Sequence, residues 1–174
     1  MDSGLSGAGR SVMEIDWGFF GELCRGLALR IARDYDPDVV LGVTKAGVIP
    51  GVVVASILGC DFAALSITRA PGRRQPTLLD EPSIVVAGRR VLIVDETCDS
   101  GATLRLAVAT VRRLQPLELR TAVSFTTGAY VPDYHALATE SLIILPWDRD
   151  VVVDGELAPR PEYAAWLAAS PRRD

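Results

Sequence analysis

The chain has 174 residues, of which 49% are hydrophobic and 23% charged, and its 18 basic and 22 acidic side chains give a formal net charge of −4. This length and composition predict one compact domain with enough apolar surface for a core, and they exclude bulk disorder. The net negative charge excludes a global basic field that would attract nucleic acid. The three scattered cysteines exclude a disulfide framework and a zinc cluster.

Elements of regular structure begin after residues 1–12, a Gly/Ser-rich tail without the apolar core of a signal peptide. Apolar residues at helical spacing predict an amphipathic helix over 16–33. The wholly apolar run 39–43 predicts a strand of the kind that is buried in parallel sheets. An apolar segment over 49–58 and a strand over 62–67 follow. No apolar run reaches the roughly 18 residues of a membrane span, so we expect a cytoplasmic protein without a membrane partner.

The second half of the chain continues this alternation. Residues 68–82 contain too many prolines and glycines for a regular element and predict a long loop, the kind of segment that often carries function. A buried strand over 91–94 precedes a helix over 102–114, and apolar runs over 121–125 and 142–145 predict two further strands. Alternating strands and helices indicate an α/β domain on a mainly parallel sheet, with ligands beyond the carboxyl ends of the strands.

The segment over 91–103 carries the most informative chemistry, because a buried strand ends in two acids and a turn of small residues then opens a helix. Hydroxyl groups occur in this turn at Thr97, Ser100 and Thr103. Backbone N–H groups at a helix N-terminus, together with such hydroxyls, suit a phosphate dianion, and Gly101 permits its close approach. Asp95 and Glu96 would repel the phosphate, so they face another group such as sugar hydroxyls or magnesium. The segment therefore predicts a sugar-phosphate site.

This segment resembles the signature of the type I phosphoribosyltransferases, a hydrophobic strand, two acidic residues and a Thr/Ser/Gly-rich loop that binds 5-phosphoribosyl 1-pyrophosphate. The resemblance implies a mainly parallel central sheet flanked by helices over residues 13–150. A small C-terminal hood would follow over 151–174, where we expect a short helix around 162–167. Asp95 and Glu96 would hold the ribose hydroxyls and magnesium. The loop around the 5′-phosphate would comprise Thr97, Cys98, Asp99, Ser100, Gly101, Ala102 and Thr103.

Two further segments match parts of the same family. The first predicted strand is followed by Thr44, Lys45, Ala46 and Gly47. This run resembles the family's pyrophosphate loop, in which a strained, often cis, non-proline peptide precedes a lysine or arginine, and Lys45 would contact pyrophosphate during catalysis. The 68–82 loop corresponds to the family's flexible catalytic loop, which closes over the reacting centre and excludes water. By that resemblance three arginines help to hold pyrophosphate, Arg69, Arg73 and Arg74.

Asp99 indicates the class of acceptor base. Family members that use 6-oxopurines carry an aspartate here beside the purine N7, so the resemblance implies that Asp99 is the general acid/base. Leu145–Asp148 resembles the Pro-Trp-acid ending of the base-binding strand in bacterial xanthine and guanine enzymes. The family's lysine for the purine O6 is absent, since Thr126 and Thr127 stand there, and Leu142 stands in place of a stacking aromatic. The implied base site comprises Thr127, Leu142, Ile143, Trp147 and Asp148.

These motifs together predict a phosphoribosyltransferase that joins a base to C1′ of phosphoribosyl pyrophosphate with magnesium and releases pyrophosphate. Asp99 indicates that the base is a 6-oxopurine. The resemblance also implies a homodimer. Two alternatives stay open because the lysine and the aromatic are missing. One is a non-catalytic regulatory protein of the same fold that binds a nucleotide or phosphoribosyl pyrophosphate. The other is a phosphoribosyltransferase for a different base. No basic face predicts a nucleic-acid partner.

Overall fold

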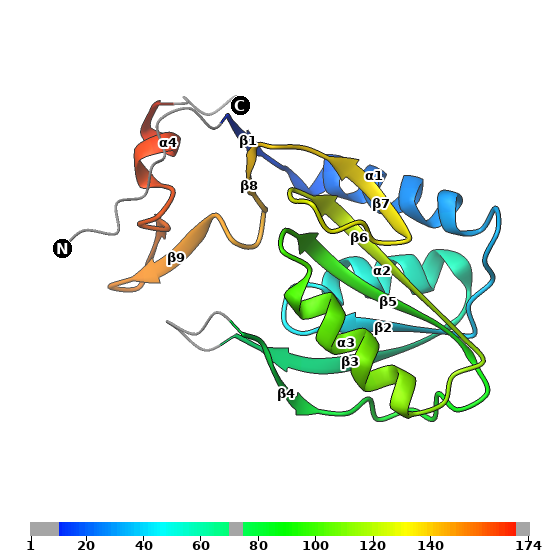
Figure 1. The fold of residues 1–174 in the computed structure, drawn as a ribbon. Coiled ribbons are helices and arrows are strands. Elements are labelled where there is room, and N and C mark those ends of the chain that lie inside the picture. The colour runs from blue at the N-terminus through cyan, green and yellow to red at the C-terminus, as the bar shows by residue number, and fades with distance from the viewer. Residues whose placement is uncertain (1–10, 70–74, 170–174) are drawn as a thin grey trace. The chain divides into compact units, whose positions relative to one another are not determined.

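A computed structural model describes residues 11–69 and 75–169 of the chain (Figure 1). The chain divides into two compact units. The larger unit is Gly21–Thr139, and the smaller one combines the two chain ends, Met1–Phe20 and Glu140–Asp174. Within the described residues, no helix is both long enough and apolar enough to cross a membrane.

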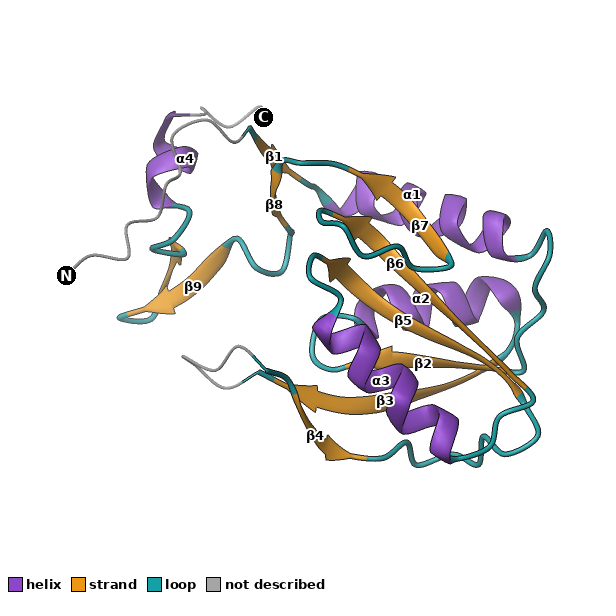
Figure 2. Cartoon of the chain, viewed as in Figure 1, coloured by secondary structure: helices purple, strands orange, loops and turns teal. Residues whose placement is uncertain are grey.

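The larger unit is built on a six-stranded sheet with the strand order β4-β3-β2-β5-β6-β7 (Figures 1 and 2). Its strands are β2 (Val39–Val43), β3 (Asp61–Thr68), β4 (Thr77–Asp80), β5 (Arg90–Cys98), β6 (Glu118–Thr126) and β7 (Tyr134–Ala138). All neighbouring pairs are parallel except β3 and β4, which are antiparallel. The predicted α/β class with a mainly parallel sheet is therefore confirmed.

Helices cover both faces of this sheet, namely α1 (Trp17–Ile31), α2 (Val48–Leu58) and α3 (Ala102–Arg113). Successive side chains of a strand point to opposite faces. Leu41 of β2 packs with Leu104 of α3 in one buried cluster. Val40, the preceding residue, packs with Ile31 of α1 and Val54 of α2 in another. The central strands are thus buried on both sides, which explains why they are continuous apolar runs in the sequence.

The smaller unit contains two short two-stranded sheets and a helix. β1 (Val12–Glu14) pairs in parallel with β8 (Leu142–Ile144), and β9 (Asp150–Val153) and β10 (Glu156–Pro159) form an antiparallel hairpin before α4 (Ala164–Ala169). The Trp147 ring centroid lies 5.5 Å from that of Trp17 and 4.8 Å from that of Phe20. Arg149 pairs with Glu14 at 2.5 Å. These contacts join the two ends of the chain.

One edge of the large sheet differs from the prediction. The expected strand over 142–145 is β8, which pairs with β1 and does not belong to the six-stranded sheet. The position next to β6 is occupied by β7, which the sequence pattern did not reveal. Two of the five residues of β7 are alanines. Because strands disfavour alanine, the extended conformation of β7 depends on its pairing with β6 more than on local preference.

The expected loop over 68–82 and the C-terminal tail also contain strands. Within the loop, β4 pairs with β3 at the sheet edge, and three of its four residues are exposed. An exposed edge strand shows no alternation of buried and polar residues, and the prolines at 76 and 82 hid it further. The tail contains the β9–β10 hairpin. Its helix, expected over 162–167, begins at Ala164.

Candidate active site

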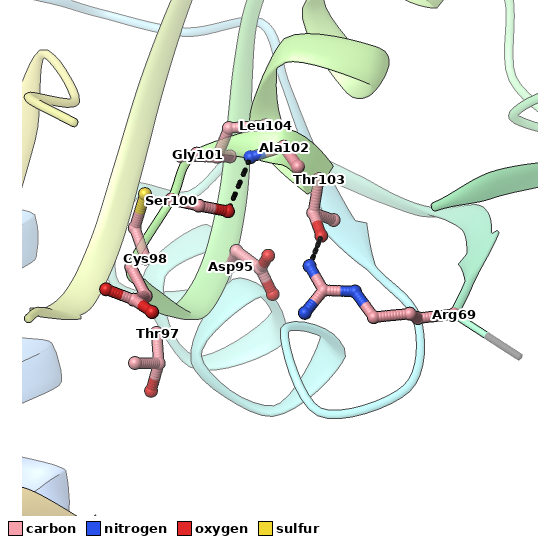
Figure 3. Close-up of a pocket in the computed structure, with 10 residues that line it drawn as sticks. Arg69, Asp95, Thr97, Cys98, Ser100, Gly101, Ala102, Thr103 and Leu104 are labelled. Carbon is pink, nitrogen blue, oxygen red and sulfur yellow. Dashed lines mark hydrogen bonds between the residues drawn. The ribbon is translucent and has the colours of Figure 1, made fainter. Parts of the chain in front are cut away.

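The carboxyl ends of β2, β3 and β5 lie at one edge of the sheet because these strands are parallel neighbours. Two cavities lie at this edge. The first, of about 210 Å³, is lined by Arg69, Asp95, Thr97, Cys98, Asp99, Ser100, Gly101, Ala102, Thr103 and Leu104 (Figure 3). The second, of about 230 Å³, is lined by Val43, Thr44, Ile67, Thr68, Arg69, Asp95, Glu96, Thr97 and Thr103. The cavities adjoin, since they share four of these residues.

The first cavity is formed by the turn between β5 and α3, residues 97–103, which we call the phosphate cradle. Gly101 has a φ of 74°, in the left-handed region, and lies directly before the first residue of α3. The Ala102 N–H donates a hydrogen bond to Ser100 Oγ at 3.4 Å (Figure 3). The first residues of α3 line the cavity together with the hydroxyl groups of the turn. A helix N-terminus with hydroxyls beside it suits a phosphate dianion.

The phosphate cradle is supported by two residues that the motif does not include. A Cβ atom at Gly101 would lie 2.3 Å from the Tyr130 ring, so this ring packs directly on the glycine. The Arg105 guanidinium lies 5.2 Å from the centroid of the same ring, in cation–π geometry. Its Nη2 also donates to the Ser100 carbonyl at 2.6 Å. Sequence reasoning missed Tyr130 and Arg105 because no spacing in the chain connects them to the cradle.

Asp95 lies between the two cavities. Its side chain is buried, with 6% exposed, and Oδ1 accepts a hydrogen bond from the Glu96 N–H at 3.0 Å. Burial and the neighbouring Glu96 carboxyl raise the pKa of Asp95 well above its usual range. A Cβ atom at Gly47 would lie 2.7 Å from Asp95 Oδ1, so only glycine allows this loop to approach the carboxylate. The predicted acids and the predicted pyrophosphate loop are thus brought together.

The predicted pyrophosphate loop, residues 44–47, is attached to β3. The Thr44 N–H donates to the Leu65 carbonyl at 3.0 Å, and the Thr44 hydroxyl lies 3.2 Å from both the N–H and the carbonyl of Ile67. The Thr44–Lys45 peptide bond is cis, as the family resemblance implied. Thr44 lines the second cavity. The side chain of the next residue, Lys45, is exposed to solvent.

The predicted arginines have different outcomes. Arg69 follows β3, and its Nη2 donates to Thr103 Oγ1 at 3.3 Å (Figure 3). Its side chain therefore reaches the phosphate cradle, and it lines both cavities. Arg73 and Arg74 lie outside the described residues.

The phosphate cradle contacts Thr127 and Gly128, the two residues that follow β6. The Thr127 N–H donates to the Cys98 carbonyl at 2.9 Å. A Cβ atom at Gly128 would lie 2.5 Å from Asp99 Oδ1, so the Asp99 carboxylate packs against Gly128. Asp99 is otherwise exposed and lines the first cavity. The Asp99 carboxylate thus lines this cavity, whereas Thr127 is bonded to the cradle through its N–H and is not one of the lining residues.

Cys98 has a structural environment within the phosphate cradle. Its side chain is buried, and burial raises the pKa of the thiol to about 11. A thiol with a raised pKa is a weak nucleophile at neutral pH. Cys98 therefore contributes packing and its backbone groups to the cradle.

The other predicted base-site residues belong to the smaller unit. Leu142 and Ile143 lie in β8 opposite Val12 and Met13 of β1. Trp147 is part of the aromatic cluster described above. The Asp148 carboxylate pairs with Arg160 at 2.8 Å and accepts a hydrogen bond from the Tyr163 hydroxyl at 2.8 Å. Trp147 and Asp148 therefore already have partners within their own unit.

Comparison with known proteins gives the class of the molecule. Residues 16–156 match the family model of the phosphoribosyl transferase domain. The match spans most of the chain, so the chain belongs to this family. The expected family, fold and enzyme class are confirmed, and the protein is a phosphoribosyltransferase.

The individual relatives have low sequence identity to this chain. The xanthine-guanine phosphoribosyltransferase of Gluconobacter oxydans is 24% identical over 143 residues, which cover 77% of this chain and 83% of that protein. The enzyme of the same name from Cereibacter sphaeroides is 26% identical over 147 residues, covering 77% and 85%. The crystal structure of a purine phosphoribosyltransferase from Pyrococcus horikoshii superposes with a TM-score of 0.73 at 29% identity, covering 84% of this chain and 99% of that one.

Proposed function

We propose that this phosphoribosyltransferase transfers the 5-phosphoribosyl group from phosphoribosyl pyrophosphate to a 6-oxopurine and releases pyrophosphate. One observation carries the proposal: the buried Asp95 lines both the cavity of the phosphate cradle and the second cavity beside the 44–47 loop, and its neighbour Glu96 lines the second. Such a site matches a ribose that carries a phosphate on one side and pyrophosphate on the other. The names of the relatives support a purine as the acceptor.

In this proposal the phosphate cradle binds the 5′-phosphate, and Asp95 and Glu96 accept hydrogen bonds from the ribose hydroxyls. Pyrophosphate binds at the second cavity with Thr44 and Lys45. The transition state is a cationic sugar ring, and the two carboxylates stabilise it by placing negative charge close to C1′. These groups mainly position the substrate, which lowers the entropic part of the barrier.

Magnesium fits the same pair of acids. Among the described residues, no group of three or more His, Cys, Asp or Glu side chains could hold a metal alone. Magnesium in enzymes of phosphorylated substrates is usually held by one or two carboxylates together with the phosphates themselves. Asp95 and Glu96 line the second cavity and can supply those ligands. The ion would neutralise charge on the departing pyrophosphate.

Asp99 is proposed as the general acid/base for the purine. Its carboxylate lines the first cavity, is exposed and is held against Gly128. From there it can take the proton of the purine N7 as N9 attacks C1′. Thr127 is the base-site candidate with the most support, because its N–H is bonded to the cradle itself. Roles for Leu142, Ile143, Trp147 and Asp148 in base binding stay predictions.

A homodimer and a cytoplasmic location complete the proposal. α2 contains no charged residue and Ser56 as its one polar side chain, yet its apolar residues Val52 and Ile57 are 43% and 45% exposed. Exposed apolar residues on a helix without charges favour a partner that covers them, and a second copy of the chain would do so. The three cysteines, Cys24, Cys60 and Cys98, are free thiols, which suits a reducing compartment.

The test is pyrophosphate release with magnesium, phosphoribosyl pyrophosphate and one base per reaction, from hypoxanthine, guanine, xanthine, adenine, uracil and orotate. We expect release with at least one 6-oxopurine. Asp99→Asn should lower kcat by roughly 10²–10⁴-fold and leave the affinity for phosphoribosyl pyrophosphate nearly unchanged. Equal losses in both quantities would contradict the acid/base role.

The same assay separates the two alternatives. Tight binding of phosphoribosyl pyrophosphate with no release from any base would favour a regulatory protein that keeps the site without the reaction. Release with adenine or a pyrimidine alone would indicate a phosphoribosyltransferase for a different base.

A further inference from the structure

The segment 127–130, which follows β6, lies against the phosphate cradle. β5 and β6 are parallel neighbours, and their register places Cys98 opposite Thr126 at the ends of the two strands. The residues that continue these strands therefore leave the sheet side by side. The Thr127 N–H donates to the Cys98 carbonyl at 2.9 Å, which extends the pairing by one residue. The sheet thus fixes the start of this segment against the cradle.

The far end of the segment is fixed as well. The Thr126 hydroxyl donates to the Tyr130 carbonyl at 3.4 Å and closes the segment into a turn. The Tyr130 ring packs on Gly101, and the Arg105 guanidinium lies over the same ring. The segment therefore has two anchors on the cradle, one on each side of residues 128 and 129.

Gly128 lies between these anchors, and neither its conformation nor its burial requires a glycine. It is exposed to solvent, and it is not one of the glycines with a left-handed φ. The space of its missing side chain is taken by Asp99. A Cβ atom at position 128 would lie 2.5 Å from Asp99 Oδ1 and would overlap the Asp99 carbonyl, well inside the roughly 3.5 Å of ordinary contact. Glycine at this position therefore leaves room for one particular carboxylate.

Steric contact is what restrains the Asp99 carboxylate. Among the described residues, no hydrogen bond or ion pair holds it. A general acid/base must lie within hydrogen-bond reach of the proton that it transfers. A displacement of about 1 Å can lower the rate by roughly a hundredfold. The residue that Asp99 packs against therefore affects the reaction.

We infer that Gly128 is a positioning residue, which holds the Asp99 carboxylate in place for the acceptor base because it has no side chain. The two anchors keep Gly128 itself in place. This inference rests on the proposed acid/base role of Asp99 and adds a residue that lines neither cavity. A side chain at position 128 would move the acid without touching the substrate.

A double-mutant cycle tests this inference. The kcat of pyrophosphate release with a 6-oxopurine is measured for the wild type, Gly128→Ala, Asp99→Asn and the double variant. Gly128→Ala should lower kcat by roughly ten- to a hundredfold in the wild type. In the Asp99→Asn background it should lower kcat by less than about twofold, because asparagine keeps the shape of the side chain but leaves no acid to misplace.

The matched control is Gly26→Ala. Gly26 is an exposed glycine of α1, and a Cβ atom there meets nothing within 4 Å. This variant should retain the kcat of the wild type. Gly128 is also exposed, so Gly128→Ala should fold, and circular dichroism checks this.

The outcomes separate the inference from the proposed function. Equal fold losses in the two backgrounds, or no loss in the wild type, would overturn the positioning role, and the proposed function would stand. If Asp99→Asn retains kcat, the acid/base role and the inference are both wrong. If the wild type releases no pyrophosphate with any base, the proposed function is wrong as well.

Asp99→Glu replaces Gly128→Ala if the alanine variant is unfolded. Glutamate keeps the acid but displaces it by one methylene, so kcat should fall by about tenfold or more. Wild-type kcat in Asp99→Glu would overturn the inference, because the position of the acid would then not matter.

Discussion

Acidic residues lie at both ends of the six-stranded sheet, but their surroundings differ between the two ends. At the amino end of the strands, Asp38 pairs with Arg90 at 2.8 Å and Asp61 with Arg89 at 2.6 Å. At the carboxyl end, the ion pairs of the described residues include neither Asp95 nor Glu96. Strand β5 contains residues of both ends, since Arg90 is its first residue and the two acids lie near its carboxyl end.

The pKa values of these acids shift in opposite directions. Hydrogen bonds from Arg90 lower the pKa of Asp38 to about 2. Burial and Glu96 raise that of Asp95. A carboxylate that pairs with an arginine stabilises the folded protein. A buried carboxylate beside another acid destabilises the folded protein as long as no ligand is bound. The comparison therefore predicts that the acids at the amino end serve stability and that those at the carboxyl end serve ligand binding.

The largest expected effect is that of Asp95→Asn. The substitution keeps the shape of the side chain and an acceptor for the Glu96 N–H, but removes a buried charge. We expect activity to fall by about a hundredfold or more, because ribose and magnesium lose an ionic partner. In magnesium-free buffer the free energy of unfolding should rise. Steady-state kinetics and urea unfolding in EDTA measure the two effects, and a less stable variant would contradict the assignment.

A smaller effect is expected from Gly101→Ala, with Gly88→Ala as its control. Both glycines have a left-handed φ, 74° and 70°, but a Cβ atom at Gly88 meets nothing within 4 Å. At Gly101 it would overlap the Tyr130 ring. Gly88→Ala should therefore cost about 1 kcal/mol of unfolding free energy through backbone strain alone. Gly101→Ala should cost about 2–4 kcal/mol.

Ligand binding separates these two variants further. Gly101→Ala should raise the KM for phosphoribosyl pyrophosphate roughly tenfold, since the phosphate cradle must shift, whereas Gly88→Ala should leave it unchanged. Equal KM values in the two variants would show that Tyr130 does not position the cradle.

The smallest effect is expected at the amino end, from Asp38→Asn. Its lowered pKa means that the ionised form stabilises the fold above about pH 4 and that this contribution disappears as the pH falls toward 2. The wild type should therefore have the higher Tm near neutral pH, and the difference should vanish near pH 2. Thermal unfolding across this range measures it. Unlike Asp95→Asn, this variant should retain wild-type kcat and KM.

Part of the fold could be predicted because its signals are local. The strand over 39–43 coincides with β2, and the helix over 102–114 exceeds α3 by one residue. Buried central strands and an amphipathic helix carry their burial in their own residue patterns. The edge strands β4 and β7 and the partner of β8 were not predicted, because an edge strand is extended only when a neighbour pairs with it.

The candidate site likewise combines features that the local sequence predicts with contacts that depend on the tertiary structure. The sequence by itself determined the strand, the turn and the helix that make up the predicted phosphate cradle and its two acids, since these segments follow one another and need no distant partner. Only the tertiary structure decided that Tyr130 packs on Gly101, that Arg69 reaches Thr103, and that Gly128 meets Asp99. Each of these contacts joins segments about 30 residues apart, which only strand order brings together.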